Sequence, residues 1–93
     1  MLLLVCRLKV ITYLFSMTVP PLQKSLNMTF GLNVRKYRLL LAMSQDEFAE
    51  KCDLHRTYIG AIERGERNIT LATLERVAKA LNVAPLKLLK SDE

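Results

Sequence analysis

Residues 45–64, with the sequence QDEFAEKCDLHRTYIGAIER, decide the fold of this chain. The apolar positions of this stretch are Phe48, Ala49, Cys52, Leu54, Ile59 and Ile62. Their spacing predicts two short helices, over about residues 45–52 and 56–64, joined by a turn at residues 53–55. Ala49 is small where the second helix must come close to the first, and Ile59 and Ile62 are placed to pack the second helix inward.

The residues at the ends of both helices support these boundaries. Ser44 is a suitable N-cap, and Asp46 and Glu47 follow it in the first turn, where negative charge favours a helix N-terminus. Gly65 stands where a helix commonly ends in a left-handed residue. The outward positions of the second helix are then Arg56, Thr57, Tyr58, Gly60, Ala61 and Arg64. A surface of this shape and chemistry fits the major groove of DNA.

Two further helices are expected at the ends of the domain. The first covers about residues 30–42 and turns Val34, Tyr37 and Leu41 to one side. The last begins with Pro85, which fits a first helical turn. Its apolar residues are Leu86, Leu88 and Leu89. Because so small a domain cannot bury all three leucines against itself, they are expected to form a dimer interface.

One more helix is expected over residues 71–81, between the other helices and the one that begins at Pro85. It follows the N-cap Thr70 and ends before Asn82, which accepts a left-handed conformation. Its apolar repeat is Leu71, Leu74, Val77, Ala78 and Leu81. The predicted fold class is therefore all-α, with a compact domain of five helices over residues 28–93.

Residues 1–27 form a separate N-terminal extension or linker in this interpretation. Residues 1–19 are mostly apolar, but Arg7 and Lys9 interrupt them, so no stretch reaches the roughly 20 residues that span a bilayer. These charges stand inside the apolar part, unlike those of a secretory signal. Since Met17 and Met28 are alternative starts, the extension is expected to be dispensable or not normally translated. The alternative is an extra strand or helix that packs on the domain or on a partner.

The composition predicts a soluble, folded domain, and the expected localisation is the cytoplasm, at the bacterial nucleoid. The chain has 93 residues, of which 51% are hydrophobic and 25% charged. Its net charge is +5, but residues 1–27 hold three basic residues and no acidic one. The remainder is only slightly basic, so charge alone does not establish a nucleic-acid partner.

The sequence lacks the combinations of residues that catalysis or metal binding requires. The sequence has no paired carboxylates, nucleophile with a base, or glycine-rich phosphate loop. His55 is the only histidine, and Cys6 and Cys52 lie in different contexts. No catalytic residue, metal, cofactor, small-molecule ligand or membrane contact is therefore expected, and Cys52 is interpreted as a small core residue.

From about Phe30 to Leu89 the chain resembles the Cro and phage-repressor family of helix-turn-helix regulators, also called the XRE family. The segments that carry the resemblance are LAMSQDEFAEKC (41–52), LHRTYIGAIERGERN (54–68) and TLERVAKALNV (73–83). The second segment is most similar to the recognition helix of restriction–modification controller proteins. The resemblance implies a lambda-repressor-like bundle of five helices. It also implies a homodimer on paired operator half-sites in double-stranded DNA, and control of a restriction–modification operon.

The resemblance and the helix geometry together assign DNA contacts to individual residues. Base contacts are expected from Arg56, Thr57, Tyr58 and Ala61. Phosphate contacts are expected from Gln45, His55, Arg64, Arg67 and Asn68. Arg56 is expected to determine specificity, because an arginine there can pair with both acceptors of a guanine.

The resemblance also implies an ion pair between Arg38 and Glu63, which would join the helix over residues 30–42 to the end of the helix over residues 56–64. At two positions the chain departs from the pattern, since Ala42 and Asp53 stand where the family usually has glycine. A competing function is a protein-interaction module, such as an antitoxin or anti-repressor subunit, motivated by the apolar extension and the leucine-rich C-terminus.

Overall fold

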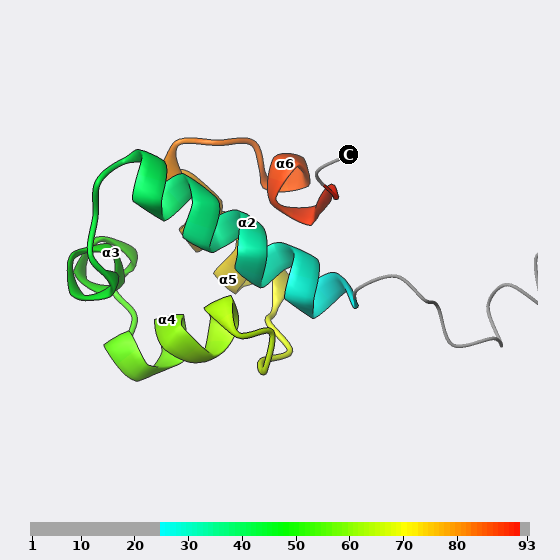
Figure 1. The fold of residues 1–93 in the computed structure, drawn as a ribbon, viewed down its shortest axis with the longest axis horizontal. Helices are drawn as coiled ribbons and strands as arrows, with labels where there is room; N and C mark the ends of the chain where they lie inside the picture. The colour runs from blue at the N-terminus through cyan, green and yellow to red at the C-terminus, as the bar shows by residue number, and fades with distance from the viewer. Residues whose placement is uncertain (1–24, 92–93) are drawn as a thin grey trace, which may run out of the picture.

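The structure, a computed structural model, describes residues 25–91. They form five helices and no strand: α2 (Leu26–Leu40), α3 (Gln45–Cys52), α4 (Arg56–Glu63), α5 (Leu71–Leu81) and α6 (Pro85–Leu89). The all-α prediction is confirmed. Figure 1 looks down the axis of α3 while α4 runs across the view, so the two central helices cross at a steep angle. The expectations for residues 1–24 lie outside the described residues.

The first helix begins earlier than expected. Ser25 is its N-cap, with an Oγ that accepts a hydrogen bond from the Met28 backbone N–H at 3.2 Å. Ser25 and Asn27, which the sequence placed in the linker, therefore belong to the folded domain. At the other end, Leu41 lies just beyond the helix and is 48% exposed, so its predicted place in the buried stripe is wrong.

Left-handed residues follow four of these helices, α2 to α5. Ala42 and Asp53, the two positions where the resemblance departs from glycine, have φ values of 56° and 57°. Asn82 and Gly65 also have positive φ, at 56° and 74°, as the sequence predicts. Ala42 is the costly case, because a Cβ in this conformation lies too close to the following carbonyl oxygen.

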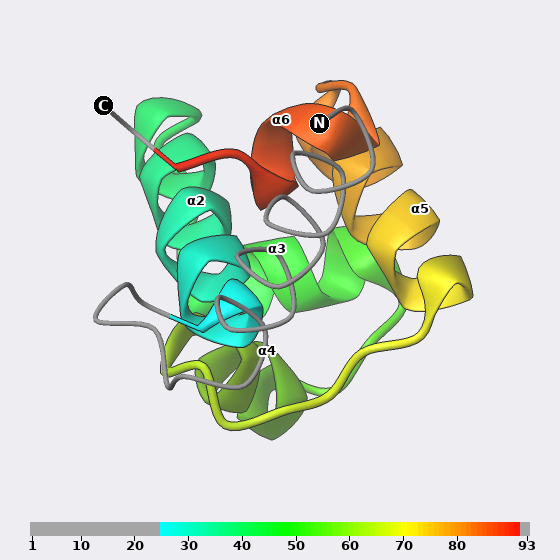
Figure 2. The ribbon, with the colours of Figure 1, turned by 90° about the vertical axis from the view of Figure 1, so that its right-hand side faces the viewer.

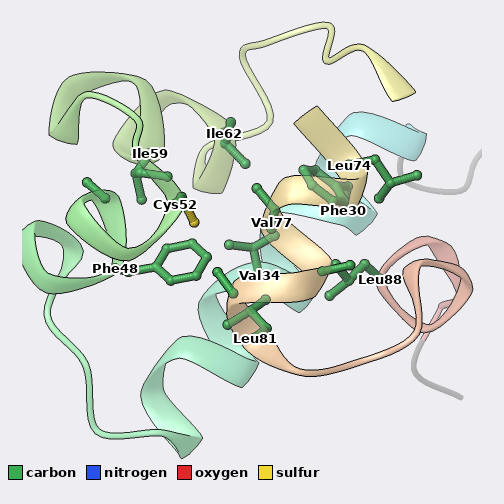
Figure 3. Packing of buried hydrophobic residues seen from close by; sticks show 13 residues of the cluster. Phe30, Val34, Phe48, Cys52, Ile59, Ile62, Leu74, Val77, Leu81 and Leu88 are labelled. Atoms are coloured by element: carbon green, nitrogen blue, oxygen red, sulfur yellow. The ribbon is translucent and has the colours of Figure 1, made fainter. Parts of the chain in front are cut away.

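The core gathers one apolar side of every helix. Figure 3 shows Phe48 and Cys52 of α3 facing Ile59 of α4, with Val34 of α2 and Val77 of α5 beside them. Burial in these apolar surroundings raises the pKa of the Cys52 thiol to about 11, although nearby Arg76 and Lys51 act in the opposite direction. Cys52 is therefore a protonated core thiol at neutral pH, as the sequence predicts.

The last helix is held against the first by a polar side chain in the core. The Asn33 side-chain amide donates to the carbonyl oxygens of Leu88 (2.8 Å) and Lys90 (2.9 Å). Leu88 is consequently 0% exposed, so its predicted role in a dimer interface is wrong. Figure 2 shows α6 between α2 and α5 at one end of the domain, with α4 at the opposite end.

A glycine that the sequence analysis did not single out allows α2 and α4 to approach. A Cβ at Gly31 would collide with the carbonyl oxygen of Ile62 and would lie 2.9 Å from that of Glu63. Both obstacles are backbone atoms, which cannot move without shifting α4. Gly31 thus sets the distance between the long first helix and the end of α4.

Leu71 is the other apolar residue whose predicted burial is wrong. It is 79% exposed, because it lies in the first turn of α5 at one side of the buried face.

No helix of residues 25–91 is long and apolar enough to cross a membrane.

Candidate nucleic-acid interface

The N-terminus of α3 is built by a capping box. Ser44 Oγ accepts from the Glu47 backbone N–H at 3.1 Å, and Glu47 Oε1 accepts from the Ser44 backbone N–H at 3.2 Å. Helix geometry leaves the N–H groups of Gln45 and Asp46 without an intrahelical acceptor. This end of the helix therefore presents donors and a positive dipole end, the arrangement that binds phosphate.

A buried ion pair lies directly behind this helix end. Arg38 donates to both carboxylate oxygens of Glu63, through Nε at 2.7 Å and Nη2 at 3.0 Å. Arg38 Nη1 also donates to the carbonyl oxygen of Met43 at 2.8 Å. The predicted pair is present, and its two-point geometry fixes α2, the turn before α3 and the end of α4 relative to one another.

The N-terminus of α4 is capped by a histidine. His55 Nδ1 accepts from the Thr57 backbone N–H at 3.1 Å. The exposed His55 therefore caps α4, and its expected phosphate contact stays a prediction.

The first residues of α4 occupy the exposed surface as expected. Arg56 and Thr57 are exposed, while Tyr58 is partly buried against the core. The Arg56 Nε atom lies 3.3 Å from Oδ1 of Asp46, a contact across the two helices that sequence reasoning missed. No local sequence pattern predicts this contact, since Asp46 was interpreted only as a charge at a helix N-terminus.

Ala61 is not an outward residue, and its predicted base contact is wrong. It is 6% exposed. After α4 the chain folds back, with the Glu66 backbone N–H donating to the Ala61 carbonyl oxygen at 3.0 Å. The guanidinium of Arg67 lies over the Tyr58 ring, 5.5 Å from its centroid, on the turn before Ala61.

A polar recess joins the two helix ends. It has a volume of about 200 Å³ and is lined by Gln45, Arg56, Thr57, Gly60 and Arg64. Gly60 keeps it open, since a Cβ there would lie 3.2 Å from Nη1 of Arg64 and 3.8 Å from Oε1 of Gln45. Two guanidinium groups beside a helix N-terminus make this recess complementary to an anionic group.

The loop after α4 carries the remaining predicted phosphate contacts. Arg64 Nε donates to Glu66 Oε1 at 3.0 Å, which raises the pKa of Arg64 and lowers the pKa of Glu66. Both side chains are exposed, so water screens this pair and it is free to open. Asn68 Oδ1 accepts from the Asn27 side-chain amide at 2.6 Å, which ties the loop to the start of α2.

At the far end of the domain, exposed leucines surround an apolar groove. Leu86 is 75% exposed and Leu89 is partly buried. The groove is lined by Leu26, Asn27, Phe30, Ile69, Thr70, Leu71, Leu74 and Leu89. Of the three leucines predicted for a dimer interface, Leu86 and Leu89 remain available.

No group of three metal-ligating side chains occurs in residues 25–91. The sequence of the chain is similar to that of helix-turn-helix proteins. A sequence model of the helix-turn-helix family matches residues 34–88. Control protein C.BamHI of Bacillus amyloliquefaciens is 50% identical over 66 residues, which cover 70% of this chain and 82% of that protein.

Two solved structures extend the comparison to the fold. The restriction–modification controller protein C.AhdI of Aeromonas hydrophila superposes with a TM-score of 0.64 at 35% identity, covering 67% of this chain and 94% of that one. The controller protein C.Esp1396I, as a tetramer with its natural 35 base-pair operator, gives a TM-score of 0.63 at 34% identity and covers 73% and 100%. The chain therefore belongs to the XRE-type helix-turn-helix family, together with the restriction–modification controller proteins that it resembles.

Proposed function

We propose that this protein is a sequence-specific regulator of transcription that binds double-stranded DNA as a homodimer on paired operator half-sites. The observation that carries the proposal is the orientation of α4. Ile59 and Ile62 hold one side of this helix in the core, while Arg56 and Thr57 remain exposed at its N-terminus. A helix supported in this way can enter the major groove with its first residues at the base edges.

Three residues are proposed to read bases. Arg56 has the reach and the donor geometry to pair with O6 and N7 of a guanine. Thr57 can donate to or accept from a base edge, and the hydroxyl of Tyr58 can do the same. Arg56 is the main source of specificity in this proposal.

Five residues are proposed to contact the phosphate backbone. They are Gln45, His55, Arg64, Arg67 and Asn68. Gln45 and Arg64 line the polar recess, where a phosphate would meet the N-terminus of α3. Such contacts fix the register of the protein on the duplex and supply affinity without sequence choice.

Dimerisation is proposed to use the opposite end of the domain. Leu89 lines the apolar groove together with Leu26 and Leu71, and Leu86 is exposed on the same short helix as Leu89. Covering these leucines with a second copy would remove apolar surface from water, which drives association. The two copies of α4 would then stand apart, each facing its own half-site.

The regulated genes are proposed to belong to a restriction–modification operon, including the gene of this protein. The similarity to control protein C.BamHI over most of that protein's length supports this assignment. The protein would act in the bacterial cytoplasm without catalytic activity. The working domain would begin at Ser25, with residues 1–24 dispensable for operator binding.

Selection of bound fragments from random DNA tests the proposal. The full chain should enrich a half-site that occurs twice in each selected fragment. Deleting residues 1–24 should leave the selected sequence unchanged. Equal recovery of all sequences would contradict the proposed function.

A further inference from the structure

An acidic side chain lies on the surface that would face DNA. Asp46 is in the first turn of α3, and its Oδ1 is 3.3 Å from Nε of Arg56, the first residue of α4. Both side chains are largely exposed, at 70% and 65%. The residues that line the adjoining polar recess are neutral or basic. A carboxylate lies beside each of its two arginines, Asp46 beside Arg56 and Glu66 beside Arg64.

The capping hydrogen bonds of α3 do not involve this carboxylate, although its charge also suits the helix N-terminus. The same helix end already has a complete capping box, formed by Ser44 and Glu47. An exposed ion pair such as Asp46–Arg56 adds little to stability. Meanwhile a negative charge at this position repels a phosphate backbone.

We infer that Asp46 is a specificity-determining positioning residue that acts on DNA through Arg56. This inference rests on the proposed function. The shortest contact of the pair is made by Nε of Arg56, while the terminal nitrogens Nη1 and Nη2 form the outer edge of the guanidinium and are both donors. These terminal donors match O6 and N7 of guanine. Asp46 thus restrains the side chain at its inner nitrogen and directs its outer end at the base.

The same contact disfavours non-cognate DNA. An unrestrained arginine at this site could turn to the nearest phosphate and bind every sequence alike. With Asp46 beside it, the charge of Arg56 is compensated locally, and a phosphate that approaches Arg56 also approaches a carboxylate. Binding away from the operator is therefore weakened, whereas pairing with guanine retains the Nε contact.

The test compares Asp46→Asn with the matched control Glu50→Gln. Glu50 is exposed on the same helix, and both substitutions remove one negative charge. Dissociation constants of the full chain are measured for the selected operator and for a scrambled duplex of equal length, over a range of salt concentrations. Asp46→Asn should lower the ratio of specific to non-specific affinity about tenfold, chiefly by tighter binding to the scrambled duplex. Its salt slope on that duplex should steepen by about one unit. Glu50→Gln should shift both affinities equally and keep the ratio.

A double-variant cycle separates positioning from a general charge effect. In the Arg56→Ala background, Asp46→Asn should no longer change the affinity ratio, and Asp46→Glu should preserve discrimination in the native background. An unchanged ratio in Asp46→Asn, or the same loss with and without Arg56, would overturn the role of Asp46. The failure of the proposed function is a different result, since the unsubstituted protein would then bind both duplexes equally.

Discussion

Gln45 Nε2 donates a hydrogen bond to Glu63 Oε1 at 3.1 Å, so the first residue of α3 is tied to the buried partner of Arg38. Glu63 thereby serves both the core and the surface. It compensates a buried guanidinium, and it also orients a side chain of the polar recess. A change at Glu63 should therefore affect stability and DNA affinity together.

Glu63→Gln should strongly destabilise the protein, because it leaves the Arg38 charge buried without a counter-charge. The expected loss in the free energy of unfolding is about 3 to 5 kcal/mol, measured by urea titration. The control is Glu66→Gln, which opens the exposed pair with Arg64 and should leave stability nearly unchanged. Equal small effects from both substitutions would show that the Arg38–Glu63 pair contributes no more than a surface pair.

Ala42→Gly should stabilise the protein, because Ala42 has a φ of 56° and glycine adopts that conformation without a Cβ conflict. The expected gain is about 1 kcal/mol. The same substitution at exposed Ala84, where φ is −66°, should instead cost about 0.4 to 1 kcal/mol through the greater entropy of the unfolded chain. Opposite signs in urea unfolding are the predicted result, and destabilisation by both would contradict it.

Substitutions at Leu86 and Leu88 should have different effects, one on dimerisation and the other on the stability of the fold. Leu86→Glu places a charge on the exposed leucine surface, so sedimentation should show a shift from dimer to monomer with the unfolding of the monomer unaltered. Leu88→Ala empties part of the core and should cost about 2 to 5 kcal/mol of stability. If Leu86→Glu remains a dimer, the interface lies elsewhere.

Arg67→Ala should weaken binding by the same factor on operator and unrelated DNA. The loss of one phosphate contact makes the dependence of the logarithm of affinity on that of salt shallower by about one unit. Binding titrations at several salt concentrations measure this slope. An unchanged slope would remove Arg67 from the phosphate contacts and leave it only its place over the Tyr58 ring.

Local signals predicted most of this fold. The boundaries of α3 and α4 follow from apolar spacing and from caps such as Ser44, which act within a few residues. The start of α2 was missed because its cap, Ser25, follows a proline-containing stretch that was interpreted as a linker. At Ala42 and Asp53 the sequence shows a departure from the glycine that is usual in the family, but it does not show that both residues adopt the left-handed conformation.

The errors concern which side of a short helix is covered. α6 has only five residues, so the spacing of its leucines does not show which of them faces the core. The orientation of α6 is fixed by Asn33 of α2, which donates to the carbonyl oxygen of Leu88. Ala61 is likewise buried, at 6% exposed, although the apolar spacing of α4 placed it on the outward side. The contact between Asp46 and Arg56 depends on how α3 and α4 cross, which no local pattern encodes.

The exposed start of α4 is the central claim, and the base preferences of Arg56→Ala test it most directly. The selected half-sites of this variant should match those of the unsubstituted protein except at one base pair, where the preference for guanine is lost. The cost at the original operator should be about 1 to 3 kcal/mol. Unaltered preferences, with an equal loss of affinity for every sequence, would contradict the account and assign Arg56 to the phosphate backbone.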